Sequence, residues 1–72
     1  MSQWSSTKAR IVYRALVRIG WKPADTQEGS HLKLRNPNFS YSYTWAFSDS
    51  DELGPKMLSR IAKKTGLKPE DL

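Results

Sequence analysis

Residues 29–35 read Gly29-Ser30-His31-Leu32-Lys33-Leu34-Arg35. Apolar and charged side chains alternate along this stretch, as in a β-strand with one buried face. The two leucines then point into a core. His31, Lys33 and Arg35 stand on the opposite face, and the glycine–serine pair before them is typical of a tight turn. A lone imidazole on a strand beside two cations is suited to acid–base chemistry on a phosphodiester.

The composition is that of one small, basic domain. The 72 residues include 12 Lys and Arg and 7 Asp and Glu, a net charge of +5. This balance favours nucleic acid or an acidic partner protein, although solubility alone also explains it. The chain has no cysteine, which excludes disulfides and thiolate chemistry and fits a reducing cytoplasm. With a single histidine, we expect neither a metal nor another cofactor.

No segment has the pattern of a leader peptide or a membrane span. The apolar runs are shorter than the roughly 20 residues that cross a bilayer, and the first residues lack the apolar core of a signal peptide. We expect residues 1–7 to form a flexible tail, from which Trp4 could fold back, and residues 8–72 to form a single domain.

The spacing predicts a first helix from about Lys8 to Ile19, with Ser6 or Thr7 as N-cap and Gly20 as the stop signal. Its apolar stripe consists of Val12, Ala15, Leu16 and Ile19. A cationic row on the other side consists of Arg10, Arg14 and Arg18. Such a row is usually a solvated helix face; the alternatives are phosphate contacts or docking to an acidic partner.

A second helix is predicted from Pro55 to Thr65. Pro55 suits its first position, Gly66 suits the residue after its end, and Leu67 can close that end with an apolar contact. The apolar face consists of Met57, Leu58, Ile61 and Ala62. The cationic face consists of Lys56, Arg60, Lys63 and Lys64.

Three strands are predicted between the helices. The first, within residues 21–28, is irregular; Trp21 anchors it in the core and Pro23 places it at a sheet edge. The second is His31–Arg35, and the third runs from about Ser40 to Phe47. The aromatic residues on one face of the third strand are Tyr41, Tyr43, Trp45 and Phe47. They could stack on bases, but a domain this small needs their area in its core.

An acidic loop follows the third strand. Asp49, Asp51 and Glu52 could suggest magnesium or calcium, but they match no ligand pattern, so we expect a charge complement to the N-terminus of the second helix. The element order then predicts an α+β fold. A three-stranded antiparallel sheet carries two helices packed on one face and leaves its other face open.

The sequence resembles the HicA (YcfA-like) family of toxins. The resemblance lies in three stretches: the helix exit Ile19-Gly20-Trp21, the turn Gly29-Ser30-His31, and a closing helix that ends Lys64-Thr65-Gly66-Leu67. It covers the chain from about residue 8 to residue 72. It implies an α-β-β-β-α fold similar to double-stranded-RNA-binding domains. It also implies a ribonuclease that cuts messenger RNA without a metal, with His31 as the catalytic residue, and a HicB-like antitoxin as partner.

The chain departs from the family where many members carry a second histidine, near the end of the third strand. Here that region reads Ala46-Phe47-Ser48-Asp49. His31 would therefore work with water or Lys33, or shuttle the proton itself. The predicted RNA-binding residues are Ser30, Lys33, Arg35, Lys56, Arg60, Lys63 and Lys64. The predicted partner-binding residues are Arg10, Arg14 and Arg18. The alternatives are a non-catalytic RNA-binding module and a protein-interaction domain.

Overall fold

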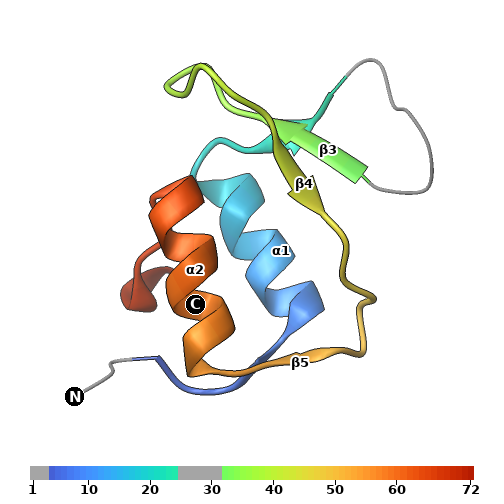
Figure 1. Ribbon diagram of the computed structural model, residues 1–72, viewed down its shortest axis with the longest axis vertical. Coiled ribbons are helices and arrows are strands. Elements are labelled where there is room, and N and C mark those ends of the chain that lie inside the picture. Colours follow the sequence, from blue (N-terminus) through green and yellow to red (C-terminus); the bar gives the residue numbers. More distant parts are fainter. Residues whose placement is uncertain (1–3, 25–31) are drawn as a thin grey trace.

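The computed structural model describes residues 4–24 and 32–72. Its elements are β1 (Thr7–Lys8), α1 (Ala9–Arg18), β2 (Lys22–Pro23), β3 (Leu32–Arg35), β4 (Tyr43–Trp45), β5 (Glu52–Leu53), α2 (Pro55–Thr65) and a 3₁₀ turn (Pro69–Asp71). The helices lie beside each other, and β2, β3 and β4 form an antiparallel sheet in that order (Figure 1). The predicted α+β, double-stranded-RNA-binding-domain-like architecture is confirmed.

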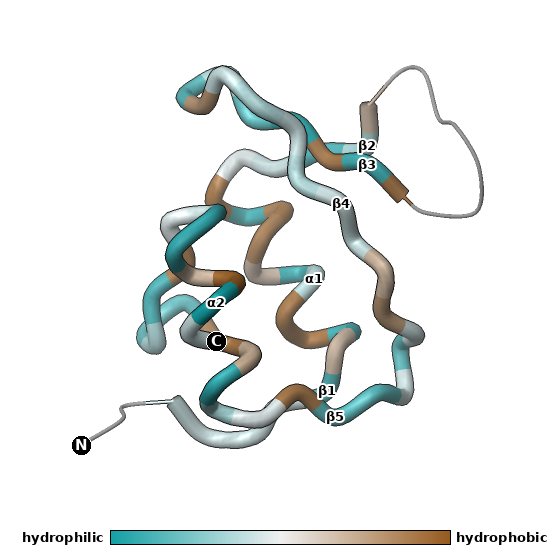
Figure 2. Tube along the Cα trace, in the orientation of Figure 1, coloured by the Kyte–Doolittle hydropathy of each residue, from teal (hydrophilic) through white to brown (hydrophobic). Residues whose placement is uncertain are grey.

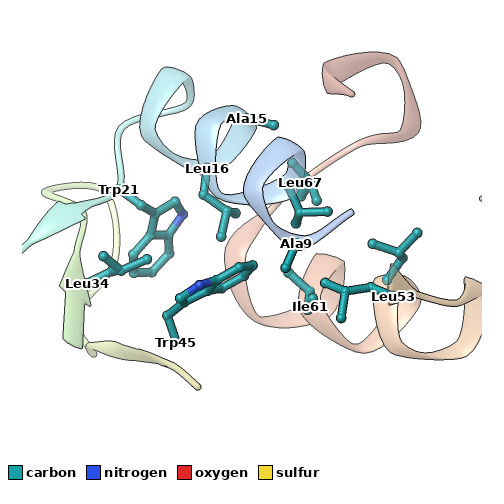
Figure 3. Close-up of a cluster of buried hydrophobic side chains, with 11 residues drawn as sticks. Ala9, Ala15, Leu16, Trp21, Leu34, Trp45, Leu53, Ile61 and Leu67 are labelled. Atoms are coloured by element: carbon teal, nitrogen blue, oxygen red, sulfur yellow. The ribbon is translucent and has the colours of Figure 1, made fainter. Parts of the chain in front are cut away.

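The core lies between the sheet and the helices. Leu34 and Trp45 from the sheet side meet apolar residues of both helices (Figure 3). Trp21, just after α1, is fully buried, and its indole N–H donates to the carbonyl oxygen of Thr65 at 3.0 Å. This bond ties the entry of the sheet to the end of α2, so the predicted anchoring role of Trp21 is confirmed.

The start of α1 differs from the prediction. Thr7 and Lys8 form β1, which pairs antiparallel with β5 in a second, two-stranded sheet. The helix begins at Ala9, and Lys8 occupies the N-cap without a side-chain hydrogen bond. The predicted Ser6 or Thr7 cap is therefore wrong, because long-range pairing keeps the preceding backbone extended. Trp4 packs against the core, as the sequence allowed.

The second helix has the predicted bounds, Pro55–Thr65. Gly66 ends it with a φ of 77°, a conformation that glycine adopts without strain. Leu67 follows with only 3% of its surface exposed, which confirms the predicted apolar closure. Hydrophobic and hydrophilic positions alternate along both helices (Figure 2), as expected when one side faces the core.

The turn after β3 supports the end of α1. Asn36 is buried; its Nδ2 donates to the carbonyl oxygen of Ile19 at 3.1 Å, and its Oδ1 accepts from the Asn38 N–H at 2.9 Å. Gly20 lies against the Asn36 side chain with a φ of 112°. The predicted helix stop at Gly20 and the turn at residues 36–38 thus form one joint between helix and sheet.

The third strand is shorter than predicted. Tyr43–Trp45 forms β4, and its register pairs these residues with Leu34–Leu32 of β3. Its aromatic face packs inward: Trp45 is 6% exposed, and Tyr43 and Phe47 pack against the core. Tyr41 is more exposed, and its hydroxyl donates to the carbonyl oxygen of Lys64. For Tyr43 and Trp45, the core interpretation is thus supported over base stacking.

The acidic loop precedes α2, whose first turn contains no acidic residue of its own. The predicted charge complement from the loop to that helix stays a prediction. Within the loop, the Asp51 carboxylate accepts from the Ser48 N–H at 2.9 Å and closes the loop on itself. Glu52 lies in β5, with its carboxylate 4.0 Å from the Lys8 ammonium group.

Candidate functional site

One face of the sheet is cationic and points away from the helices. The alternation in β3 holds: Leu34 is buried, whereas Arg35 is exposed. The register pairs Lys33 with Thr44 and Lys22 with Arg35, and residues directly opposite in an antiparallel pair share a face. Lys22, Lys33, Arg35 and Thr44 therefore make up what we call the open face. None of the residues of β2, β3 and β4 is acidic.

The open face can hold a phosphate group. Lysine and arginine donate charge-assisted hydrogen bonds to phosphate oxygens, and arginine can do so with two N–H groups at once. Lys33 is half-buried and Arg35 is exposed, both on a strand paired on both sides. The backbone of β3 therefore fixes the spacing of these two cations.

The predicted catalytic residue His31 and the predicted RNA-binding residue Ser30 lie outside the described residues. Their roles stay predictions. The sequence joins His31 directly to Leu32, the first residue of β3.

At the same end of the sheet the surface is hollowed. A pocket of about 440 Å³ is lined by Tyr13, Leu32, Trp45, Ala46, Phe47, Ser48 and Asp49. Leu32 pairs with Trp45 across the strands, and the ring centroid of Trp45 lies 5.7 Å from that of Tyr13 and 5.1 Å from that of Phe47. The sequence does not reveal this pocket, because Tyr13 belongs to the first helix and no local pattern joins it to residues 45–49.

The open face and the pocket lie on different sides of β4. Thr44 points to the open face and Trp45 to the core and the pocket. Behind the strand, burial raises the pKa of the Tyr43 hydroxyl above its usual value of 10.0. Tyr43 therefore stays neutral at physiological pH and adds no charge to the site.

The helix cations occupy other surfaces. The predicted RNA-binding residues of α2 are all exposed on the helix layer: Lys56, Arg60, Lys63 and Lys64. The structure does not gather them with Lys33 and Arg35, which lie on the sheet face turned away from the helices. The predicted partner-binding row of α1, Arg10, Arg14 and Arg18, is also exposed, and the Arg18 guanidinium donates to the carbonyl oxygen of Asp71.

Within residues 4–24 and 32–72, no cluster of three or more potential metal ligands occurs. In the same part of the chain, no helix has the length and apolar character needed to cross a bilayer.

The fold and the site define a small, basic α+β domain, with a cationic face on one side of its sheet and an aromatic pocket on the other side of β4. The family model described as the HicA toxin of bacterial toxin–antitoxin systems matches residues 9–67. The chain therefore belongs to the HicA toxin family, and the resemblance inferred from its sequence is confirmed. Comparisons with curated proteins and with solved structures find no significant match.

Proposed function

We propose that this protein is the toxin of a toxin–antitoxin pair and acts as a metal-independent endoribonuclease on messenger RNA. The family match over residues 9–67 carries the proposal. The cations on β3 support it, because an enzyme that cleaves RNA must bind a phosphodiester and stabilise the charge that develops on it.

In the proposed mechanism, the RNA supplies its own nucleophile. The imidazole of His31 takes the proton of a ribose 2′-hydroxyl, and the 2′-oxygen attacks the adjacent phosphorus. The bond from phosphorus to the 5′-oxygen of the next nucleotide breaks, and the His31 imidazolium returns the proton to that leaving oxygen. The products are a 2′,3′-cyclic phosphate and a 5′-hydroxyl end. Histidine can serve in both steps because its unperturbed pKa, about 6.5, lies close to cellular pH.

Neighbouring residues assist the reaction in this proposal. Lys33 and Arg35 hold the phosphate and stabilise its extra negative charge, and Ser30 orients the imidazole or donates to a phosphate oxygen. The α2 cations bind the RNA backbone away from the reacting phosphate. The arginines of α1 bind a HicB-like antitoxin.

Induced expression in bacteria tests the proposal. The native chain should arrest growth and degrade bulk RNA, whereas His31→Ala should do neither while keeping the native circular dichroism spectrum and melting temperature. Purified protein should cleave RNA equally with and without a chelator. Equal toxicity of the native and His31→Ala chains would exclude the mechanism. Loss of cleavage in the chelator would exclude metal independence.

A second candidate is a non-catalytic RNA-binding module of the same fold. One observation favours it: the chain has a single histidine, so no second imidazole can share the proton transfers. This module would bind RNA with an affinity that falls as salt rises, and His31→Ala would leave that affinity unchanged. Intact RNA after expression of the native chain would favour this candidate over the nuclease.

A further inference from the structure

The pocket at the end of the sheet has the size and the walls of a ligand site. Its volume of about 440 Å³ falls within the range of roughly 300–1,000 Å³ that is typical of small-molecule pockets. Tyr13 comes from α1, Leu32 from β3 and Trp45 from β4, so three elements of the fold hold its walls. Phe47 adds a third ring in edge contact with Trp45.

Aromatic walls suit a flat ring system whose faces are apolar and whose edges are polar. Tyr13 and Phe47 are only partly buried, so their rings remain accessible beside the well-buried Trp45. Many proteins bind single-stranded RNA in this way: the unstacked bases lie on aromatic side chains, whose faces accept any base.

The rim of the pocket carries a carboxylate on a fixed loop. Ser48 and Asp49 line the pocket. The Asp51 carboxylate accepts from the Ser48 N–H, the Asp51 N–H donates to the Ser48 carbonyl oxygen, and the Asp49 carbonyl oxygen accepts from the Arg10 N–H at 3.4 Å. The backbone is therefore held at three points. The Asp49 carboxylate itself makes no hydrogen bond or ion pair with any residue in the described part of the chain.

A carboxylate repels the phosphate groups of RNA. The Asp49 carboxylate lies beside an aromatic pocket in a basic protein, which suggests that it faces a base rather than the RNA backbone. Carboxylate oxygens only accept hydrogen bonds. Guanine offers two adjacent donors on one edge, the ring N1–H and the exocyclic 2-amino group, which match the two oxygens of one carboxylate. Adenine and cytosine offer one amino group beside a ring acceptor, and uracil offers one ring N–H between two carbonyl oxygens.

We propose that this pocket binds a single base of the RNA strand and that Asp49 gives it a preference for guanine. The inference rests on the proposed action on RNA and adds a specificity determinant to it. The base lies against Phe47 and Tyr13, with its Watson–Crick edge toward Asp49. The adjoining phosphates then run toward Lys33 and the open face of the sheet.

Binding to uncleavable probes tests the proposal. The probes are pentanucleotides of 2′-O-methyluridine with guanosine, adenosine, cytidine or uridine analogues at the centre; without a free 2′-hydroxyl they cannot be cut. Fluorescence anisotropy at low salt should show about tenfold tighter binding of the guanine probe, as a two-point contact to a base edge provides. Asp49→Asn should abolish that preference.

Two further variants separate base recognition from charge and packing. Glu70→Gln removes the same charge from an exposed residue outside the pocket, and it should keep the guanine preference. Phe47→Leu retains an apolar side chain but removes the ring, and it should weaken binding of all four probes about fivefold. Melting temperatures of the three variants monitor folding, because the loop of Asp49 also contacts the start of α1.

Several outcomes would overturn the proposal: equal binding of the four probes by the native chain, no binding of any probe, or an unchanged guanine preference in Asp49→Asn. These results are distinct from failure of the proposed function. If the chain cleaves RNA through His31 but shows no base preference, only the proposal for the pocket fails. If the chain prefers guanine but cleaves no RNA, only the proposed nuclease activity fails.

Discussion

A single buried amide joins the helix layer to the sheet. Asn36 is 4% exposed and uses both ends of its side chain: the amino group binds the last turn of α1, and the oxygen binds the turn that leads to β4. A group with a donor and an acceptor fits this place. A purely accepting side chain leaves the Ile19 carbonyl oxygen without a donor, and an apolar side chain leaves both partners unsatisfied.

Asn36→Asp should lower the free energy of unfolding at neutral pH by about 1–3 kcal/mol, because a carboxylate oxygen then faces the carbonyl oxygen of Ile19 in place of a donor. The loss in the free energy of unfolding should be smaller in acid, because a protonated carboxyl group can again donate a hydrogen bond to the Ile19 carbonyl oxygen. Urea unfolding across pH measures both effects. Asn38→Asp, at an exposed site, is the matched control and should stay within about 0.5 kcal/mol of native. A deficit that grows in acid would contradict this account.

At the scale of the elements, both helices begin without a side-chain cap and without an acidic residue in the first turn. Their stability therefore comes from burial of their apolar faces against the sheet and each other, rather than from their ends. The start of α2 is open to improvement, because Gly54 occupies its N-cap in an extended conformation, and a Cβ there would meet nothing within 4 Å.

Gly54→Ser should therefore raise the free energy of unfolding by about 0.5–1 kcal/mol, through a capping hydrogen bond and a less flexible unfolded chain. Gly20→Ala should do the opposite and cost about 1–3 kcal/mol, because φ is 112° there and a Cβ would lie 2.8 Å from Asn36 Nδ2. Thermal and urea unfolding of the two variants measure the contrast. Equal effects of the same sign would show that backbone conformation does not govern these positions.

The elements that the sequence predicted well carry their signals locally. Pro55 and Gly66 mark the ends of α2 within the helix itself, and the alternation of residues 32–35 shows one face of β3. β1 and β5 carry no such signal, because each has only two residues and exists through pairing with a distant partner. The pocket could not be predicted for the same reason, because its residues are distant in the sequence. The cationic residues of β3 could be found from the alternation alone.

At the scale of the whole molecule, positive charge is spread over both layers. The open face of the sheet, the row on α1 and the outer side of α2 each carry several cations. Such a distribution lets one small protein meet an RNA strand and an acidic protein on different surfaces, and the proposed division assigns α2 to RNA and α1 to the antitoxin.

Two double variants with the same change in charge test this division. Arg10→Gln/Arg14→Gln on α1 should weaken binding of the HicB-like antitoxin about tenfold or more and leave RNA affinity within a few-fold. Lys56→Gln/Arg60→Gln on α2 should weaken RNA binding and reduce its salt dependence, with little effect on the antitoxin. Calorimetry with the antitoxin and anisotropy with RNA give the two affinities. Equal losses in both assays for both variants would show that only net charge matters.

The pairing of β1 with β5 also has a consequence for protein synthesis. Thr7 and Lys8 leave the ribosome early, but their partners Glu52 and Leu53 emerge only after most of the chain, and the core further requires Leu58, Ile61 and Leu67. A nascent chain that stops before α2 lacks both the partner strand and part of the core, so it cannot complete the fold. Translation that stops before α2 would thus leave an unfolded fragment, and the folded domain forms only once α2 has been made.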